Sequence, residues 1–372
     1  MSIFISCGET SGDNYLALLI TSLKKKGFTG DLWGMIGPRT EKAGGRKVWS
    51  CQELQLMGFI EVLPSVPRLM KLKNRIMDEI LSVNPEQVIV VDSPDFHLPL
   101  IRSLRRNGFR GFIVYIAPPT VWAWREGRAK TLAECCNLCL PILPFENDFL
   151  LDKGVESRWI GHPLLDNLMG YKPPKNMSKY IGQQTVVALL PGSRPGEVKN
   201  HLPILLECAA RLHTLAAKPV FSISTGLPEA LKCEMRDKMG DWDFYEGPAK
   251  DIISVAEAVV GVSGTVSVES MLLGKYMIVI YEGSFFSWLI YKLMIKIRYI
   301  SIPNIMAGKI IFPEYLRRDI SVDNILGSLE RYLKDDAYHR EIAEEICVLQ
   351  GKMGRKGASD FWADCILELR KP

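Results

Sequence analysis

Residues 186–190 and the segment after them constrain the fold more than any other part of the chain. Five consecutive apolar residues predict a buried strand, Pro191 and Gly192 end it, and residues 201–212 have helical apolar spacing. Comparable apolar runs, each followed by a turn, recur at 3–6, 88–91, 112–116, 140–143, 220–224, 258–262 and 277–281. Strands that alternate with helices in this way predict an α/β fold with parallel, doubly wound sheets.

Length and composition narrow the class of protein. A chain of 372 residues is long enough for two domains, and 47% apolar with 24% charged residues is typical of a globular protein. The net charge of +4 is too balanced to indicate a nucleic-acid partner, so none is expected. No signal peptide is evident, and no apolar run reaches the roughly 18 residues of a membrane span.

The nine cysteines indicate reduced thiols rather than disulfides or a zinc site. They lack paired metal-ligand spacing, and the group Cys135, Cys136 and Cys139 has no histidine near it. These thiols are interpreted as small buried hydrophobic groups, and neither a metal nor a cofactor is expected.

A polar, proline-stiffened stretch at 171–176 predicts the domain boundary. The expected domains are 1–170 and 177–345, with helices in 346–372 packing back on the N-terminal domain. The last segment, 359–370, supports this because its apolar residues share one helical face.

Two turns of the second half have the features of anion sites. Gly192, Ser193 and Arg194 lie between a strand and a helix, where backbone N–H groups and a guanidinium can bind phosphate. The alternative is an ordinary turn with a solvated arginine. Ser263, Gly264 and Thr265 precede a second helix, whose Glu269 can bind ribose hydroxyls or can be an ordinary surface carboxylate. Asn304, in an expected loop at 301–308, offers an amide to a base or phosphate.

Two turns of the first half carry carboxylates. Glu9 lies in the glycine-rich turn between the first strand and helix. Asp95 and His97 follow a buried strand, where open α/β sheets bind ligands, and either can accept a proton from a sugar hydroxyl. The alternative is that Asp92 and Asp95 only cap the next helix.

A very apolar, cationic segment near residue 290 has the composition of an interfacial helix. It is too short to span a bilayer, and the alternative is a buried helix whose lysines reach solvent. The residues expected to contact membrane or acyl chains are Phe285, Phe286, Trp288, Lys292, Lys296 and Arg298. Residues 57–77, which mix apolar and basic side chains, allow the same two interpretations.

Eight short motifs in a fixed order resemble the lipid-A-disaccharide synthase family, a group of glycosyltransferases of the two-Rossmann GT-B type. The resemblance covers residues 3–320 and rests on these motifs: Gly8-Glu9-Thr10-Ser11-Gly12-Asp13, Asp92-Ser93-Pro94-Asp95-Phe96, Val121-Trp122-Ala123-Trp124-Arg125, Leu143-Pro144-Phe145-Glu146, Gly161-His162-Pro163, Leu190-Pro191-Gly192-Ser193-Arg194, Ser263-Gly264-Thr265 with Glu269, and Pro303-Asn304-Ile305-Met306-Ala307-Gly308. Thr10 stands where the family has alanine, and Arg317 where glutamine is expected.

The resemblance implies two Rossmann-like domains with a cleft between them and an inverting transferase at the cytoplasmic face of the inner membrane. It would join UDP-2,3-diacylglucosamine to 2,3-diacylglucosamine 1-phosphate (lipid X) through a β(1→6) linkage and release UDP. Asp95 would be the general base with Glu9 beside it, and Arg194 would neutralise the diphosphate together with Ser193 and Thr265. Glu269 and Asn304 would hold the nucleoside side, and a homodimer is a candidate assembly. The rival readings are another GT-B enzyme of UDP-sugars, such as a transferase with a soluble acceptor or an epimerase, and a non-catalytic peripheral lipid-nucleotide-binding protein.

Overall fold

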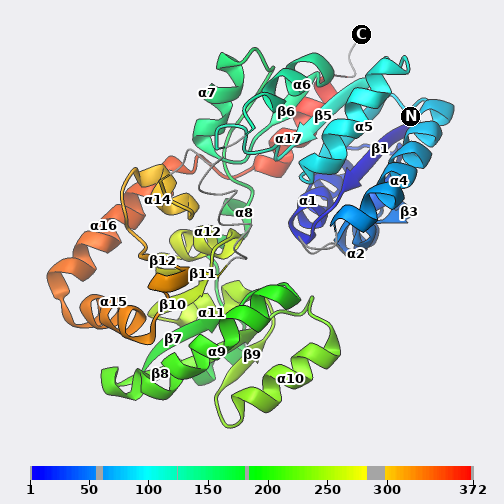
Figure 1. Ribbon diagram of the computed structural model, residues 1–372. Helices are drawn as coiled ribbons and strands as arrows, with labels where there is room; N and C mark the ends of the chain where they lie inside the picture. Colours follow the sequence, from blue (N-terminus) through cyan, green and yellow to red (C-terminus); the bar gives the residue numbers. More distant parts are fainter. Residues whose placement is uncertain (1, 56–61, 124, 181–183, 283–297, 370–372) are drawn as a thin grey trace. The chain divides into compact units, whose positions relative to one another are not determined.

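The computed structural model describes residues 2–55, 62–123, 125–180, 184–282 and 298–369 and divides into two compact units (Figure 1). The first unit comprises Met1–Asp166 and Met353–Pro372, and the second comprises Asn167–Lys352. Helix α8 (Leu165–Leu168) lies at the boundary. The polar stretch 171–176 belongs to the second unit, where the Tyr171 hydroxyl donates a hydrogen bond to Asp251.

The first unit contains a parallel sheet of six strands in the order β3-β2-β1-β4-β5-β6. These strands are β1 (Ser2–Cys7), β2 (Asp31–Ile36), β3 (Arg46–Ser50), β4 (Gln87–Val91), β5 (Phe112–Ile116) and β6 (Leu138–Leu140). This is the strand order of the Rossmann fold, in which the chain reverses direction across the sheet between β1 and β4. The prediction of a doubly wound parallel sheet is therefore confirmed.

Helices cover both faces of this sheet because successive strand residues point to opposite sides. Phe4 packs into one hydrophobic cluster, and its neighbours Ile3 and Ile5 pack into the other. Helices α4 (Val62–Val83), α5 (Pro94–Arg106), α6 (Arg128–Cys135) and α7 (Pro144–Asp152) contribute to the first cluster. Figure 1 shows α4 and α5 along that face. The short helices α2 (Pro38–Ala43) and α3 (Gln52–Gln55) follow β2 and β3.

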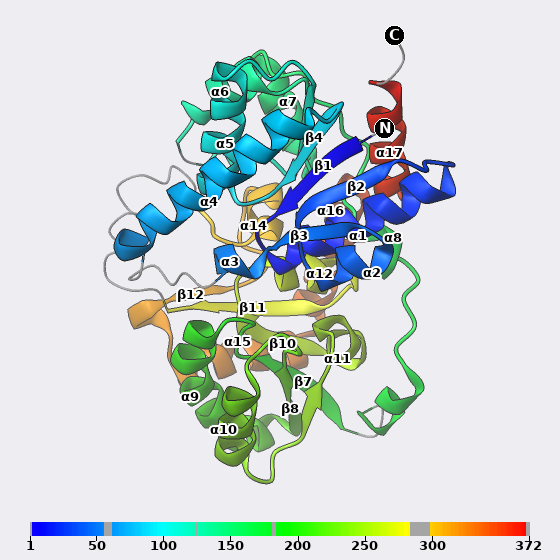
Figure 2. The same ribbon diagram turned by 90° about the vertical axis from the view of Figure 1, so that its right-hand side faces the viewer.

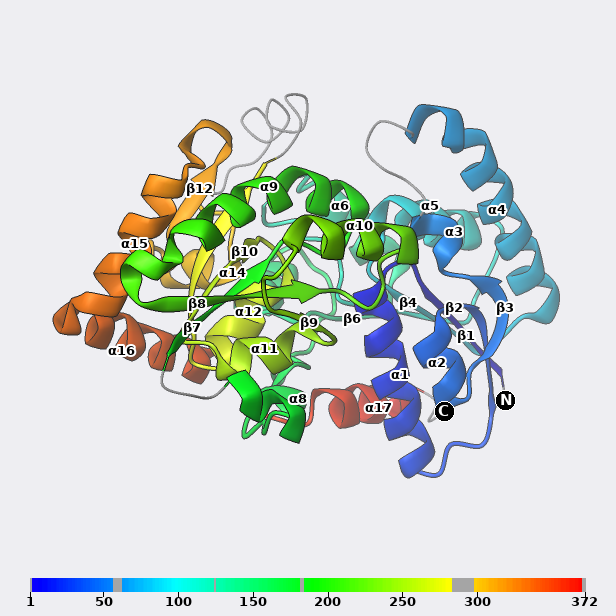
Figure 3. The ribbon, with the colours of Figure 1, turned by 90° about the horizontal axis from the view of Figure 1, so that it is seen from below.

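The opposite face is covered by α1 (Thr10–Lys25) and by α17 (Ala358–Glu368) from the far end of the sequence. Figure 3 shows α17 beside α1. Trp362 packs edge-on against Tyr15 with ring centroids 6.0 Å apart, and the Gln87 amide donates to the Ile366 carbonyl at 2.9 Å. Lys26 forms an ion pair with Asp364 at 2.8 Å. The C-terminal helix is therefore part of the core of the first unit.

The second unit repeats this topology. Its six parallel strands lie in the order β12-β11-β10-β7-β8-β9, so β7 and β10 flank the reversal point as β1 and β4 do in the first unit. The strands are β7 (Thr185–Leu190), β8 (Ala217–Ile223), β9 (Phe244–Glu246), β10 (Ala258–Val262), β11 (Tyr276–Tyr281) and β12 (Glu314–Leu316).

Helices also pack on the second sheet. Helix α9 (Pro195–Arg211) contacts α10 (Glu229–Met239) and α15 (Val322–Lys334), and Figure 2 shows these three together. Helix α12 (Thr265–Leu272) contacts α11 (Ala249–Val255), α14 (Ile302–Ala307) and α16 (Asp336–Lys352). Short 3₁₀ helices occur at Lys175–Tyr180, Leu212–Leu215 and Arg317–Asp319.

The structure corrects several predicted elements. The strand expected at 140–143 is wrong, since β6 ends at Leu140 and Pro141, which follows, has no N–H to donate. The loop expected at 301–308 contains helix α14, which has proline in its first turn and ends at Gly308 with a φ of +69°. The edge strands β3, β9 and β12 were missed because most of their residues are not fully buried, so no continuous apolar run marks them.

Candidate functional site

The first candidate site lies at the carboxyl ends of β1 and β4. These strands are neighbours, with Cys7 paired to Val91, so the turns that follow them lie together. The Gly8 N–H donates to Asp92 Oδ1 at 3.1 Å. The two turns meet at the reversal point of the sheet, which is where open α/β folds bind ligands.

Asp92 is the most constrained residue of this site. Asp92 and Ser93 both have left-handed backbone conformations, with φ of 54° and 43°. The Asp92 carbonyl accepts hydrogen bonds from the Tyr115 hydroxyl at 2.6 Å and from His97 Nδ1 at 2.8 Å. The surroundings hold a strained backbone in place, an arrangement that is common at functional sites.

The Asp92 carboxylate has the properties of a general base. Burial raises its pKa to about 7, and the negative charge of the nearby Glu9 adds to this rise. Hydrogen bonds that favour the ionised carboxylate partly oppose it. Its Oδ2 has no hydrogen-bond partner within the described part of the chain. A Cβ added to Gly12 would lie 2.0 Å from Oδ2, so glycine at this position makes room for the carboxylate.

The structure places the predicted base, Asp95, differently. Asp95 is exposed on the first turn of α5, and its Oδ1 accepts from Arg125 Nη1 at 3.0 Å and from Arg128 Nη2. His97 does not suit proton abstraction either, because it is fully buried and both ring nitrogens are engaged, one of them with Ser6 Oγ at 2.8 Å. Burial lowers its pKa to about 4. In the sequence, Asp92 is named only in the alternative of a helix cap, although its place directly after β4 is a signal for a functional carboxylate.

Three other motifs of the first unit have structural roles. The Asp13 carboxylate accepts the backbone N–H groups of Gly37, Arg39 and Thr40 and so caps α2. The carboxylate of Glu146 accepts hydrogen bonds from Trp122 Nε1, at 3.0 Å, and from the N–H of Leu143. The N–H of His162 donates to the Met353 carbonyl at 3.0 Å beside a bridge between Gly161 and Gly354. These residues fix the framework around the turns.

The second candidate site lies at the ends of β7 and β10, which pair through Leu190 and Gly261. The turn after β7 has the predicted shape, with Gly192 at a φ of +123° and Ser193 and Arg194 exposed. Its donors already bind an anion, the side chain of Glu197. Glu197 Oε2 accepts from the N–H groups of Ser193 at 2.9 Å and Arg194 at 3.2 Å, and Oε1 accepts from Arg194 Nη1 at 3.0 Å. The sequence signal for this contact is the acidic residue Glu197 in the first turn of α9, four residues beyond Ser193.

The turn after β10 leads into α12. Gly264 is the N-cap residue, and Gly264 and Thr265 are exposed. The Ser263 hydroxyl donates to the Ile300 carbonyl at 3.4 Å. Burial raises the pKa of Glu269, with the Lys250 charge opposing the rise, and none of the described residues forms a hydrogen bond with its carboxylate. Glu269 is thus a poorly solvated acceptor one turn into the helix.

The side-chain amide of Asn304 is not available for the base or phosphate that its motif predicted it would bind. It is fully buried, and its Oδ1 accepts from the N–H groups of Ile311 and Phe312 at 2.8 and 2.9 Å. Its Nδ2 donates to the Phe312 carbonyl at 2.7 Å and to Glu314 Oε1 at 2.9 Å. The geometry therefore supports a structural role, in which Asn304 ties α14 to β12, rather than direct reading of a base or phosphate.

Comparison with known proteins identifies the family. The sequence profile described as lipid-A-disaccharide synthetase matches residues 3–359. The chain belongs to this family. The lipid-A-disaccharide synthase of Myxococcus xanthus (strain DK1622) is 30% identical over 378 residues, covering 100% of this chain and 98% of that protein. The synthase of Syntrophus aciditrophicus (strain SB) is 34% identical over 381 residues, covering 99% and 98%.

Solved structures with low sequence identity share the fold. UDP-GlcNAc 2-epimerase from Neisseria meningitidis, bound to UDP-GlcNAc, has a TM-score of 0.65 at 13% identity and covers 99% of this chain and 100% of its own. The calicheamicin glycosyltransferase CalG4 has a TM-score of 0.62 at 12% identity and covers 99% and 97%. These likenesses confirm the GT-B architecture, which the lipid-A-disaccharide synthetase family shares with epimerases.

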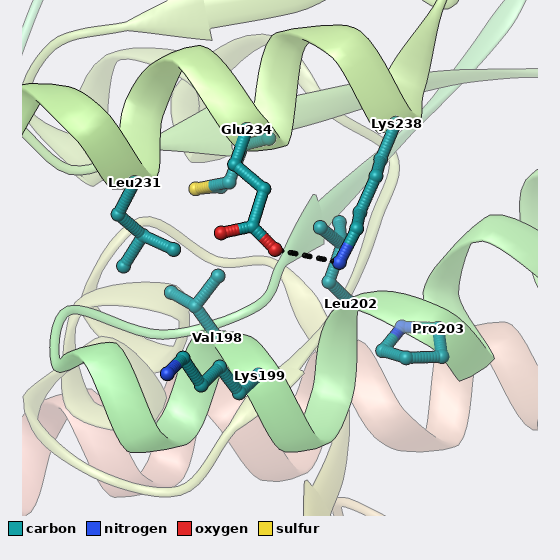
Figure 4. Close-up of a pocket in the computed structure, with 8 residues that line it drawn as sticks. Val198, Lys199, Leu202, Pro203, Leu231, Glu234 and Lys238 are labelled. Atoms are coloured by element: carbon teal, nitrogen blue, oxygen red, sulfur yellow. Dashed lines mark hydrogen bonds and ion pairs between the residues drawn. The ribbon is translucent and has the colours of Figure 1, made fainter.

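The pocket in Figure 4 is separate from both candidate sites. It lies between α9 and α10, with an apolar floor and a charged rim on which Lys238 donates to Glu234 at 2.7 Å. It faces the middle of α9, whereas the expected diphosphate turn precedes the start of that helix. Within the described ranges, no group of histidine, cysteine or acidic residues is arranged to hold a metal ion.

Most of the predicted membrane segment of this family member lies outside the described residues. Phe285, Phe286, Trp288, Lys292 and Lys296 all fall in 283–297, whereas Arg298 is exposed and stacks on Tyr299 at 5.6 Å. In the other basic segment, α4 buries Leu72, Ile76 and Ile80, as a core-facing helix does. Among the described helices, none is long and apolar enough to cross a bilayer.

Proposed function

We propose that this chain transfers 2,3-diacylglucosamine from UDP to the 6-hydroxyl of 2,3-diacylglucosamine 1-phosphate, giving the β(1→6) disaccharide 1-phosphate and UDP. The family match over nearly the whole chain supports hexosyl transfer to a lipid A precursor. The observation that carries the catalytic part is the Asp92 carboxylate, whose Oδ2 is buried without a hydrogen-bond partner among the described residues. Burial raises the pKa of this carboxylate to about 7, which suits a base at neutral pH.

The reaction is a single displacement in this proposal. The acceptor hydroxyl gives its proton to Asp92 as its oxygen attacks the anomeric carbon, and the bond from that carbon to the UDP oxygen breaks. One displacement inverts the configuration. Burial keeps the pKa of Asp92 high, and repulsion by the nearby Glu9 charge adds a smaller contribution. Asp92 thus takes the role first expected of Asp95, which two arginines already engage.

The second unit would hold UDP. Arg194 and the N–H groups of Ser193 and Arg194 would receive the diphosphate in place of the Glu197 carboxylate, which now occupies the same donors. Gly264 and Thr265, at the start of α12, would support the second phosphate, with Ser263 beside them. Glu269 would accept hydrogen bonds from ribose hydroxyls, for which an under-hydrogen-bonded carboxylate is suited.

Lipid substrates favour action at a membrane surface. Each methylene removed from water is worth roughly 0.8 kcal/mol, so molecules with two acyl chains partition into the bilayer. We propose that Phe285, Phe286 and Trp288, with Lys292, Lys296 and Arg298, contact the cytoplasmic face of the inner membrane. A homodimer is the candidate assembly, and light scattering on the purified protein tests it.

Mass spectrometry of the products made from the two lipid precursors tests the function. We expect the disaccharide 1-phosphate and one equivalent of UDP from the wild type, and no turnover of UDP-N-acetylglucosamine. Epimerised UDP-N-acetylglucosamine would instead support the epimerase reading. Disaccharide formation that persists in Asp92→Asn at the wild-type rate would remove the catalytic part of the proposal.

A further inference from the structure

His201 is a buried imidazole of α9 that the reaction above does not use. It is 1% exposed and lies one helical turn beyond Glu197, whose carboxylate occupies the donors proposed for the diphosphate. Both ring nitrogens have backbone partners. Nδ1 lies 2.7 Å from the Glu197 carbonyl oxygen, and Nε2 lies 2.8 Å from the backbone nitrogen of Glu282. The ring therefore joins the first turn of α9 to the residue that follows β11.

These two contacts define the form of the ring. The N–H of Glu282 can only donate, so Nε2 accepts and carries no hydrogen. The hydrogen of the neutral ring is then on Nδ1, which donates to the Glu197 carbonyl. Burial lowers the pKa of His201, and the hydrogen bond to the Glu197 carbonyl and the charges of Glu197 and Glu282 oppose this effect. Only the neutral ring satisfies both backbone partners.

A second side chain of α9 holds the same residue. Asn200 Nδ2 donates to the Glu282 carbonyl at 3.3 Å, so adjacent residues of α9 bind both backbone polar groups of Glu282. In the sheet, β10 lies between β7, which leads into α9, and β11, which leads to Glu282. The contact therefore connects elements on both sides of β10, and the turns after β7 and β10 form the proposed UDP site.

The start of α9 is weakly tied to the rest of its helix. Pro203 lies inside α9 and has no N–H, so the Lys199 carbonyl has no helical donor four residues further on. The ladder of helical hydrogen bonds is thus interrupted just beyond the first turn. A contact from His201 to β11 compensates for this interruption.

The contact of His201 also differs from the one that UDP would remove. The Glu197 carboxylate restrains the turn by accepting the N–H groups of Ser193 and Arg194. In the proposed function UDP displaces this carboxylate, and that restraint is lost. His201 binds the backbone of Glu197, which stays in the helix when the side chain moves.

We infer that His201 is a positioning residue for the diphosphate. It holds the Glu197 backbone to the end of β11, so that the N–H groups of Ser193 and Arg194 keep their direction when UDP replaces the Glu197 side chain. This inference rests on the proposed function and adds a residue that acts through the backbone of Glu197 rather than by contact with UDP.

The test compares the binding of UDP and of uridine by isothermal titration, because only UDP has the diphosphate. His201→Phe keeps a planar ring and removes both hydrogen bonds. It should raise the Kd for UDP about tenfold, the order expected for the loss of two hydrogen bonds, and leave the Kd for uridine unchanged. An equal loss for both ligands would mean that His201 only stabilises the unit, and an unchanged Kd for UDP would mean that it does not act on the site. Either result would overturn the inference.

Two conservative variants each keep one of the contacts and guard against a folding defect. The amide nitrogen of His201→Asn can replace Nδ1, and the amide oxygen of His201→Gln can replace Nε2. Each should bind UDP more tightly than His201→Phe does, and the inference fails if neither does. His213→Phe is the matched control, because His213 Nδ1 also lies 2.8 Å from a helix carbonyl, that of Ala210, but at an exposed position beyond the end of α9. It should bind both ligands as the wild type does.

Arg194→Ala separates this inference from the proposed function. If Arg194→Ala binds UDP as tightly as the wild type, the proposed diphosphate site fails, and the role of His201 fails with it. If Arg194→Ala weakens UDP binding and His201→Phe does not, the proposed site stands and only the positioning role of His201 is removed.

Discussion

The Glu197 carboxylate forms an ion pair with Arg194 at 3.0 Å across the turn that is expected to hold a diphosphate. The same carboxylate accepts the N–H groups of Ser193 and Arg194. The protein therefore supplies its own anion to the donors that we propose for UDP. In that proposal, UDP competes with the Glu197 side chain for these donors.

Glu197→Gln should therefore tighten UDP binding, because the amide keeps the shape of the side chain but loses the charge that repels the diphosphate. At an effective dielectric constant near 20, removal of a like charge is worth on the order of 1 kcal/mol after screening, or about fivefold in Kd. Isothermal titration with UDP measures this. Arg194→Ala is the opposite change and should lower turnover by roughly two orders of magnitude or more. Weaker UDP binding in Glu197→Gln would mean that the carboxylate positions the donors instead.

Asp92→Asn should lower turnover by roughly 10²- to 10⁴-fold and leave UDP binding unchanged. The amide keeps an oxygen for the Gly8 N–H but cannot take the acceptor proton. Since burial raises the pKa of Asp92 to about 7, the active, ionised form is lost as pH falls below 7. Wild-type kcat/KM should rise about tenfold per pH unit below pH 7 and level off above it. A flat profile between pH 5 and 8 would argue against Asp92 as the base.

Gly12→Ala should reduce turnover at least tenfold, because its Cβ would lie 2.0 Å from Asp92 Oδ2 and force the carboxylate to move. Gly327→Ala is the matched control, since this glycine lies within α15 and its Cβ would meet no atom within 4 Å. The control should keep full activity and gain about 0.5–1 kcal/mol in free energy of unfolding. Steady-state rates and thermal melts of the two variants give the comparison. Equal activity in both variants would show that the Asp92 carboxylate tolerates a Cβ at residue 12.

His162 should make the protein less stable as pH falls. Burial lowers its pKa from 6.5 to about 3, so between these values the unfolded chain binds one more proton than the folded chain. The free energy of unfolding should thus fall as pH drops from about 6 to 4, with a slope contribution of up to about 1.4 kcal/mol per pH unit. Urea titrations at several pH values measure it. His162→Gln should show a smaller slope than wild type, and a slope equal to that of wild type would contradict the prediction.

Changing Phe285, Phe286 and Trp288 together to serine should release the protein from anionic vesicles. The prediction rests on the apolar, cationic composition of 285–298. Sedimentation of the protein with vesicles measures the bound fraction, and Phe244→Ser, an exposed aromatic residue on β9, is a control that should still bind. Binding that is equal in the triple variant and the wild type would count against an interfacial segment.

Much of the fold could be predicted because its signals are local. The strands β5 and β10 appear as continuous apolar runs with the predicted bounds, and the turns after β1, β4, β7 and β10 are marked by glycine, proline or polar residues. A buried parallel strand needs apolar side chains on both faces, so the run itself carries the information. Edge strands such as β3 lack this requirement and leave no comparable signal.

The sequence alone placed a carboxylate turn at β4, an anion turn at β7 and a family resemblance across the chain. Only the tertiary structure decided which groups are available within each turn. Burial separates Asp92, with its raised pKa, from Asp95 three residues away, and hydrogen bonds commit Asn304 to the core. Desolvation and hydrogen-bond saturation depend on residues elsewhere in the chain, such as Tyr115 for Asp92 and Glu314 for Asn304. A local sequence pattern cannot predict these contacts, because they form only when the chain folds.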